Sequence, residues 1–319
     1  MTRLPIPEVV VAVAGVGLLL APFMLGNYWI RVLTTMFMFA ALASATNIMA
    51  GYTGYPAFGN VVFFGLGAYA TGLAMTKLRA PFWLGVVLAA VVCCLYAVVI
   101  GFPVLRLRGH YFAIATLGMN EATRALVENV AFTGGGMGLS LPVQRGEVDA
   151  LNRHFYFVML GLVAAAVGAT YCVTRTRLGY GCLAIRFDED AAGSCGVPTT
   201  RFKVLAWTLS AVLTGMAGAA YANWVGYIEP RAVFDMNIAV KMFVMMLLGG
   251  AATVFGPLLG ACLVELVGLM AWSQILNYHS AALGVIVIAV VIFVPGGLMS
   301  LRRGLSIRLL LDNVRASRL

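Results

Sequence analysis

Charged side chains are scarce in this chain. Only 10% of its 319 residues are charged, while 62% are hydrophobic and the mean hydropathy is +0.95. A soluble domain has roughly 25% charged residues, and a water-soluble fold of this length has too little interior to bury so many apolar side chains. The excess must face lipid, so the sequence predicts an integral membrane protein.

The sequence also lacks the motifs of most enzymes. Its six cysteines form no CxxC pair, and His110, His154 and His279 lie in three separate regions. It contains no phosphate loop ending in Gly-Lys-Ser or Gly-Lys-Thr, so the chain is not expected to bind or hydrolyse ATP itself. We therefore predict no catalytic residue, no metal site and no cofactor.

Long apolar runs make up most of the chain. They lie at residues 9–25, 32–50, 58–76, 82–105, 111–130, 155–173, 204–222, 239–250, 257–272 and 282–299. A helix needs about 20 apolar residues to cross a bilayer, so we expect an all-α polytopic bundle of about ten spans, with about eight as the lower limit. The bundle is expected to form a single transmembrane domain, residues 1–319.

Two Gly- and Pro-rich breaks, residues 51–56 and 249–257, leave little room for a solvated loop. They are either tight turns or interrupted helices whose free backbone groups line a cavity.

The basic residues indicate how the chain is oriented. The formal charge of +9 comes from short clusters of Arg and Lys between the apolar runs, which is typical of membrane topology and not of nucleic-acid binding. More of these residues lie on the side that carries both termini, although Lys77 and Arg79 run against the pattern. We expect an inner (plasma) membrane protein with cytoplasmic N- and C-termini.

The longest segment between apolar runs, residues 174–203, contains a sequence that fits a short cytoplasmic helix. Acidic residues at 188–190 suit the first turn of a helix, and Gly196 suits its end. Residues 190–196 read Asp-Ala-Ala, three residues, then Gly. This is similar to the EAA coupling motif of ABC importer permeases, with Asp190 in place of the motif's glutamate and Glu189 beside it. From composition alone, a solvated loop is the alternative.

Motifs along nearly the whole chain resemble the LivM-type branched-chain amino-acid permeases of ABC importers. They lie at residues 51–54, 59–69, 107–117, 133–139, 249–260 and 293–298. The chain departs from that pattern at Tyr55-Pro56-Ala57, where relatives usually carry Gln and a small hydroxyl residue. It departs again near Lys241, where many have an acidic residue. Both departures bear on the substrate and not on the family.

The resemblance implies a transport subunit that forms half of a translocation path within the membrane lipid. A homologous permease would complete the path as a heterodimer, two cytoplasmic ATPases would supply energy, and an extracytoplasmic binding protein would deliver substrate. The residues assigned to ATPase coupling are Glu189, Asp190, Ala191, Ala192 and Gly196. Branched-chain amino acids are the implied substrate, with urea or short amides as alternatives within the family. An ion-coupled secondary transporter or channel is the alternative class.

Ionisable residues also occur inside the apolar runs. Glu121, Arg124 and Glu128 are spaced three and four apart, so one helix face carries all three and Arg124 could bridge both acids. Lys241 and Glu265 are a candidate interhelical pair. Charges in hydrocarbon usually face a bundle interior or a watery path. A structural ion-pair network is the favoured interpretation, and a role along the path is the alternative.

Polar and flexible positions beside the breaks are candidates for the substrate path. They are Tyr52, Tyr55, Asn60, Thr116, Gly134 and Gly135. The successive glycines at 134–136 could present backbone N–H groups to a carboxylate, although a tight outer turn is the simpler interpretation.

Overall fold

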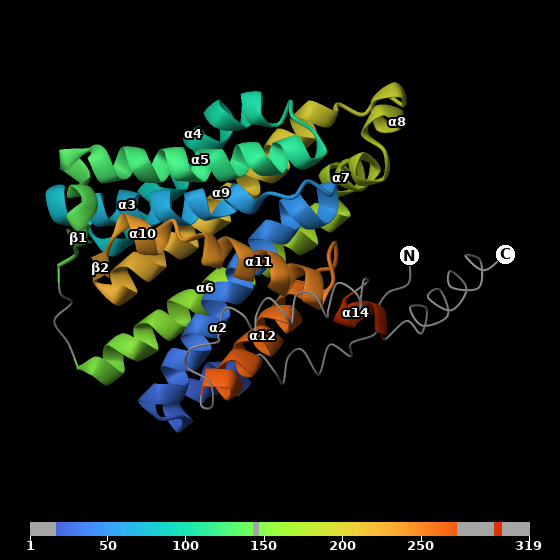
Figure 1. The fold of residues 1–319 in the computed structure, drawn as a ribbon. Helices are drawn as coiled ribbons and strands as arrows, with labels where there is room; N and C mark the ends of the chain where they lie inside the picture. The colour runs from blue at the N-terminus through green and yellow to red at the C-terminus, as the bar shows by residue number, and fades with distance from the viewer. Residues whose placement is uncertain (1–16, 143–146, 273–296, 302–319) are drawn as a thin grey trace.

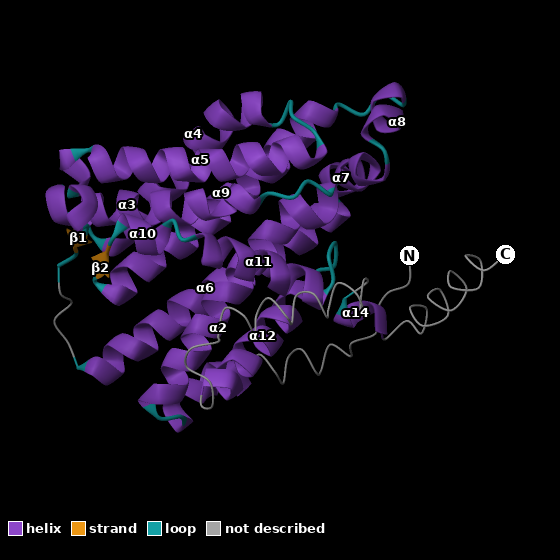
Figure 2. Ribbon diagram, in the orientation of Figure 1, coloured by secondary structure: helices purple, strands orange, loops and turns teal. Residues whose placement is uncertain are grey.

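The fold of the described residues is almost entirely helical (Figure 2), as the sequence predicted. A computed structural model describes residues 17–142, 147–272 and 297–301. The helices are α2 (Asn27–Thr46), α3 (Val61–Lys77), α4 (Phe82–Val104), α5 (Gly109–Asn129), α6 (Val148–Arg175), α7 (Arg177–Phe187), α8 (Glu189–Ser194), α9 (Thr199–Val225), α10 (Pro230–Val233), α11 (Met236–Gly249), α12 (Gly256–Trp272) and α14 (Leu298–Leu301). The short elements are the π-helix η1 (Asn47–Gly51), the 3-10 turns η2 (Phe58–Asn60), η3 (Ala131–Thr133) and η4 (Gly135–Met137), and the strands β1 (Leu139–Ser140) and β2 (Tyr227–Ile228).

Six helical segments in the described part of the chain are long and apolar enough to cross a membrane. They are Asn27–Gly51, Phe58–Lys77, Phe82–Val104, Val148–Arg175, Thr199–Val225 and Pro230–Gly249. The expected run at 257–272 forms the shorter α12, and the run at 111–130 forms α5, which is not one of the six. The expected run at 9–25 is described only from residue 17 and the run at 282–299 only from residue 297, so a count of about ten spans stays a prediction.

Helix α9 packs closely against α3 and α4. The four-residue spacing of Ala211, Gly215 and Ala219 predicts a face where a neighbouring backbone can approach, and all three residues are buried. A Cβ built on Gly67 of α3 would overlap the carbonyl oxygen of Gly215. The contact therefore leaves no room for a side chain at Gly67, and α3 and α9 form a tightly packed pair.

The side chain of Asn47 satisfies the backbone of the turn between α11 and α12. Its Nδ2 donates to the carbonyl oxygen of Thr253 at 2.8 Å, and its Oδ1 accepts from the amide of Ala252 at 2.9 Å. The Thr253 hydroxyl donates to the carbonyl oxygen of Gly250 at 2.7 Å. Of the two alternatives for residues 249–257, the structure has a tight turn whose polar groups are paired within the protein.

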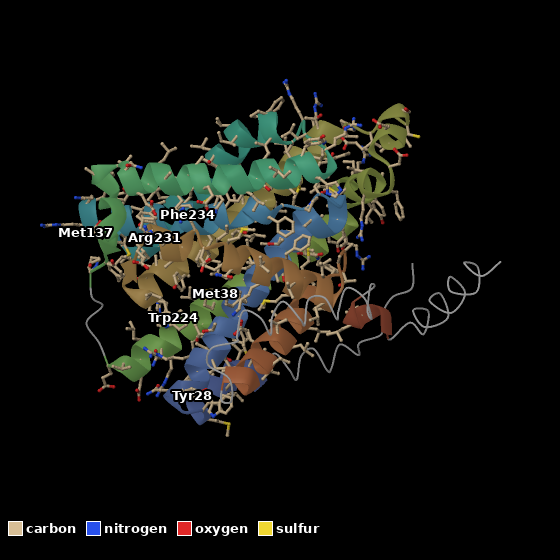
Figure 3. The ribbon with its side chains drawn as sticks, in the orientation of Figure 1. Tyr28, Met38, Met137, Trp224, Arg231 and Phe234 are labelled. Carbon is tan, nitrogen blue, oxygen red and sulfur yellow. The ribbon has the colours of Figure 1, made fainter. Side chains whose placement is uncertain are left out.

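The two ends of the bundle differ in structure (Figure 1). One end carries α7 and α8, and the other carries α10 and the two strands, where Leu139 of β1 pairs antiparallel with Ile228 of β2. Met137 and Arg231 lie at this second end (Figure 3). Because the spans run between these ends, they are the two faces that would meet opposite sides of a membrane.

Candidate functional site

Helix α8 is short, and side-chain and backbone caps fix both of its ends. The Asp188 carboxylate accepts from the amides of Asp190 and Ala191, both at 2.9 Å, which satisfies the free N–H groups of the first turn. At the other end the amide of Val197 donates to the carbonyl oxygen of Ala192 at 3.0 Å. This is the bonding pattern of a helix that ends in a left-handed residue.

Gly196 is that left-handed residue, with a φ of +82°. The helix itself ends at Ser194, two residues before the position expected from the sequence, and Gly196 forms the cap. A Cβ on Gly196 would meet no atom within 4 Å, so the backbone angle and not space is what favours glycine here.

Glu189, the first residue of α8, points inward and forms a buried ion pair with Lys203 of α9. Lys203 Nζ donates to Glu189 Oε1 at 2.6 Å, to the carbonyl oxygen of Leu105 at 3.0 Å and to the Tyr55 hydroxyl at 3.2 Å. The Tyr55 hydroxyl in turn donates to the other oxygen of Glu189. All three ammonium protons and both carboxylate oxygens therefore have partners, as a buried ion pair requires.

Within the cluster of Tyr55, Glu189 and Lys203, the surroundings shift the pKa values of Glu189 and Tyr55. Burial opposes ionisation of Glu189, but hydrogen bonds from Lys203 and Tyr55 and the nearby positive charges outweigh it and lower the pKa of the carboxyl. Burial, together with the hydrogen bond to Glu189, raises the pKa of the Tyr55 phenol. At neutral pH Glu189 is thus a carboxylate and the Tyr55 phenol is neutral.

Two further contacts join α8 and α7 to the ends of other helices. Arg108, just before α5, contacts both carboxylate oxygens of Asp190 at 2.8 and 2.9 Å, and this pair is exposed. Arg186 of α7 donates to the carbonyl oxygen of Gly51 at 2.7 Å, which ties α7 to the turn that follows α2. The ends of α2, α4, α5 and α9 therefore meet around α8.

The sequence did not identify Lys203 or Arg108 as site residues. Lys203 stands at the start of an apolar run, where a basic residue needs no explanation beyond membrane topology. Its partner Tyr55, a candidate for the substrate path, lies beside Glu189.

The other candidates for the path lie apart from one another. Asn60 is fully buried and donates to Ser210 at 2.8 Å, and Thr116 is buried where α5 crosses Gly59. Tyr52 is buried near the turn that follows α2. Gly134 and Gly135 lie at the opposite end of the bundle, in the left-handed turns after α5. The structure does not bring these positions into one site.

The five charged residues expected at membrane depth lie in three separate ion pairs. Arg124 contacts Glu121 at 2.6 Å, whereas Glu128 lies 3.9 Å from Arg231, so the expectation that Arg124 bridges both acids is wrong. The side chain of Glu128 lies next to α10 and not next to Arg124. Lys241 of α11 and Glu265 of α12 are 3.2 Å apart, as an interhelical pair.

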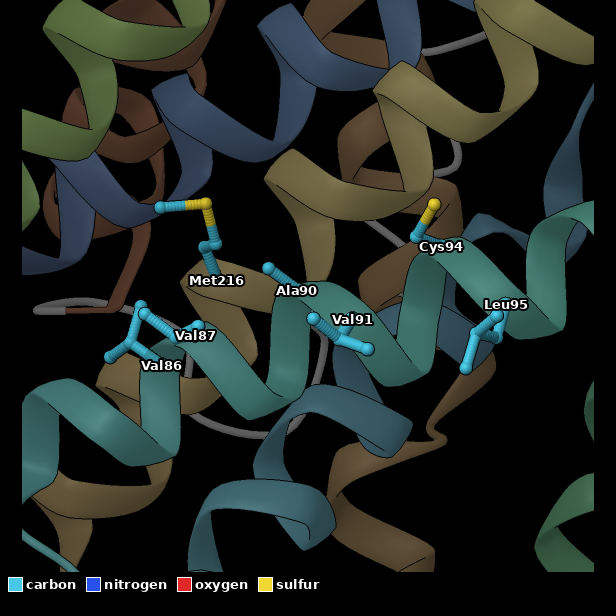
Figure 4. A pocket seen from close by; sticks show the side chains of 7 residues that line it. All are labelled: Val86, Val87, Ala90, Val91, Cys94, Leu95 and Met216. Carbon is cyan, nitrogen blue, oxygen red and sulfur yellow. The ribbon is translucent and has the colours of Figure 1, made fainter.

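A hollow of about 340 Å³ lies on the outer side of α4 (Figure 4). Its lining consists of Val86, Val87, Ala90, Val91, Cys94, Leu95 and Met216. The lining is apolar, so the hollow suits a hydrocarbon chain better than a polar solute. Among the described residues, no group of His, Cys, Asp and Glu is arranged to hold a metal ion.

Comparisons with known proteins identify the family. The model for the permease component of branched-chain amino acid transport systems matches residues 28–317. The chain is 30% identical to the high-affinity branched-chain amino acid transport system permease protein LivM of Salmonella typhimurium, over 88% of this chain and 72% of that protein. It is 28% identical to LivM of Escherichia coli over the same shares. It is 25% identical to the autoinducer 2 import system permease protein LsrC of Yersinia enterocolitica, over 72% of this chain and 64% of that protein. No solved structure matches the chain.

Proposed function

Because the chain belongs to the family of permease components of branched-chain amino acid transport systems, we propose that it forms half of the path of an ABC importer for branched-chain amino acids. A homologous permease completes the path as the other half of a heterodimer. Two separate cytoplasmic ATPases hydrolyse ATP, and an extracytoplasmic binding protein delivers the amino acid. The family match and the amino-acid transporters among the relatives support this proposal.

Helix α8 is the contact with an ATPase in this proposal. The observation that carries it is the anchoring of Glu189: the first residue of α8 is bound to α9, to the end of α4 and to the turn after α2 by one buried cluster. A surface helix fixed in this way passes an applied force to the spans, because packed elements move as rigid bodies. A loosely attached loop would absorb that force.

The proposed orientation places α8 and both termini in the cytoplasm. Five arginines follow Leu301 within the last 18 residues, and basic residues accumulate on the cytoplasmic side of membrane proteins. The strands β1 and β2 and the glycine turns then face the outside, where the binding protein docks.

The test is transport by the reconstituted complex. The chain is co-expressed with the permease and ATPases encoded beside it, purified and placed in proteoliposomes with the binding protein. We expect labelled leucine to accumulate only when ATP is hydrolysed, and an ionophore that dissipates ion gradients should leave uptake unchanged. Uptake that follows a proton or sodium gradient without ATP would overturn the proposal in favour of a secondary transporter.

A further inference from the structure

Helix α5 is long enough to span a membrane, but its exposed side carries an ion pair among apolar side chains. Its 21 residues extend about 31 Å, close to the roughly 30 Å of a hydrocarbon core. It runs beside α3 along the edge of the bundle (Figure 1), so it shares the depth of the spans.

One face of α5 is open in this subunit. The buried side of the helix, from Phe112 to Val127, packs toward the bundle. The residues at helical spacing on the opposite side are exposed: Tyr111, Ile114, Gly118, Glu121, Ala122, Ala125 and Leu126. A Cβ built on Gly118 would meet no atom within 4 Å, so the middle of this face is open space.

The open face carries an ion pair near its middle. The side chains of Glu121 and Arg124 are 56% and 34% exposed, and Glu121 lies about 18 Å along the helix from Gly109. A charged residue facing lipid at mid-helix costs about 2.5–3.5 kcal/mol. The open face of α5 therefore lies against water or protein in the assembled transporter.

Helix α4 shows what a lipid-facing surface looks like in the same subunit. Its exposed side chains are apolar from one end to the other: Trp83, Leu84, Val87, Leu88, Val91, Leu95, Val98, Val99 and Phe102. The exposed side of α4 carries no charge, in contrast to the ion pair on α5, so lipid suits α4 and water or protein suits α5.

We propose that the open face of α5 lines the substrate path, with the second permease subunit across it, and that Glu121 and Arg124 form a subsite for the charged ends of an amino acid. The Glu121 carboxylate suits the α-ammonium group, and the Arg124 guanidinium suits the α-carboxylate. The contact within the pair joins Nη2 of Arg124 to Oε2 of Glu121. Gly118 and Ala122, one turn apart, leave room beside the pair for a solute.

This inference rests on the proposed function and names the site within it. Cysteines at Gly118 and Ala122 on α5, and at Val91 and Val99 on α4 as matched controls, test which face meets water. The background carries alanine at Cys94, Cys172, Cys195 and Cys262, and keeps the buried Cys93 and Cys182. Each variant is reconstituted as the full complex and treated with a charged methanethiosulfonate reagent.

We expect the α5 cysteines to react at least about ten times faster than the α4 cysteines, because only a hydrated thiol ionises readily. Leucine delivered by the binding protein should slow the reaction on α5 alone. Equal rates on both helices would overturn the inference, and so would α5 cysteines that stay unreactive because they pack against protein. In either case, ATP-driven leucine uptake by the background complex shows that the proposed function still stands.

Charge-removing variants test the subsite itself. In complexes that assemble at the parent's level, Glu121→Gln and Arg124→Gln should each raise the KM for leucine uptake by about ten-fold. Arg124→Lys should recover part of the loss, since it restores the charge without the planar group. Glu128→Gln, two turns from Glu121 on the same helix, is the matched control and should change the KM for leucine less than about two-fold. An unchanged KM in both subsite variants, or an equal rise in the control, would refute the subsite.

Discussion

Replacing Lys203 with methionine should destabilise the protein strongly, because the Glu189 carboxylate would lose its charged partner. The two side chains are only 3% and 13% exposed. Removing one member of a buried pair costs about 3–5 kcal/mol. The double variant Lys203→Met with Glu189→Gln should recover most of this loss, since it leaves no buried charge, and the methionine keeps much of the apolar stem.

The free energy of unfolding can be measured by titrating the purified protein with a denaturing detergent in mixed micelles. Arg108→Met is the control, because the pair of Arg108 and Asp190 is 59% and 77% exposed and such pairs contribute about 0–1 kcal/mol. A double variant as unstable as Lys203→Met alone would show that packing of the lysine stem, and not charge, holds the site together.

The free energy of unfolding should change with pH in opposite directions in the parent and in Lys203→Met. In the parent the pKa of Glu189 lies below its ordinary value of 4.5, so the pair's contribution is present above that pH and lost as the pH falls through the lowered pKa. In Lys203→Met, the unpaired buried carboxyl has a raised pKa, so the variant loses stability as the pH rises above the ordinary value. The difference in the free energy of unfolding between the parent and Lys203→Met should therefore become smaller as the pH falls from about 8 to about 5.

Three other predictions concern α8 and the C-terminus. Gly196→Val should leave the subunit in the membrane but uncouple uptake from ATP hydrolysis, or lose the ATPase in a pull-down. The reason is that a β-branched side chain resists a φ of +82°. Full activity with normal ATPase retention would remove α8 from the mechanism. Asp190→Glu should keep uptake within about two-fold of the parent, since its exposed pair with Arg108 can re-form. A reporter fused after Leu319 should be active only in the cytoplasm, and activity outside would rule out the proposed topology.

Features that depend on local composition could be predicted from the sequence. The apolar runs, the small-residue face of α9 and the acidic start of α8 follow from the residues within one helix. The positive φ of Gly196 also follows from local chemistry, because a helix that ends at glycine usually uses this angle. The family was recognised from six different motifs that resemble those of the family and follow the same order along the chain.

Contacts between distant segments could not be predicted in the same way. Tyr55 and Glu189 are 134 residues apart, and Asn47 and Thr253 are 206 apart. These pairs form because packed helices bring their ends together, and hydropathy carries no information about which ends meet. The spacing of Arg124 allowed bridges to both acids, but the side chain of Glu128 lies closer to Arg231 of α10.

Tyr55 connects α8 to the face that we assign to the substrate path. Its hydroxyl binds Glu189, while its ring packs edge-on against Phe112 of α5, with the ring centroids 5.2 Å apart. Four residues later, Gly59 lies so close to Thr116 of α5 that a Cβ would overlap its carbonyl oxygen. Protein interiors are densely packed and yield little to compression, so a displacement of α8 should reach α5 through this turn.

Mutations can separate the hydroxyl contact of Tyr55 from its ring contact. Tyr55→Phe keeps the ring against Phe112 and loses only the hydroxyl, whereas Tyr55→Ala loses both contacts and leaves Glu189 paired with Lys203. We expect both variants to retain the ATPases, and Tyr55→Ala to lower the number of leucine molecules imported per ATP by about five-fold, with a smaller loss in Tyr55→Phe. Proteoliposomes that report uptake and ATP hydrolysis together give this ratio. An unchanged ratio in Tyr55→Ala would mean that movement of α8 reaches the path through the close contact of α9 with α3, without the turn.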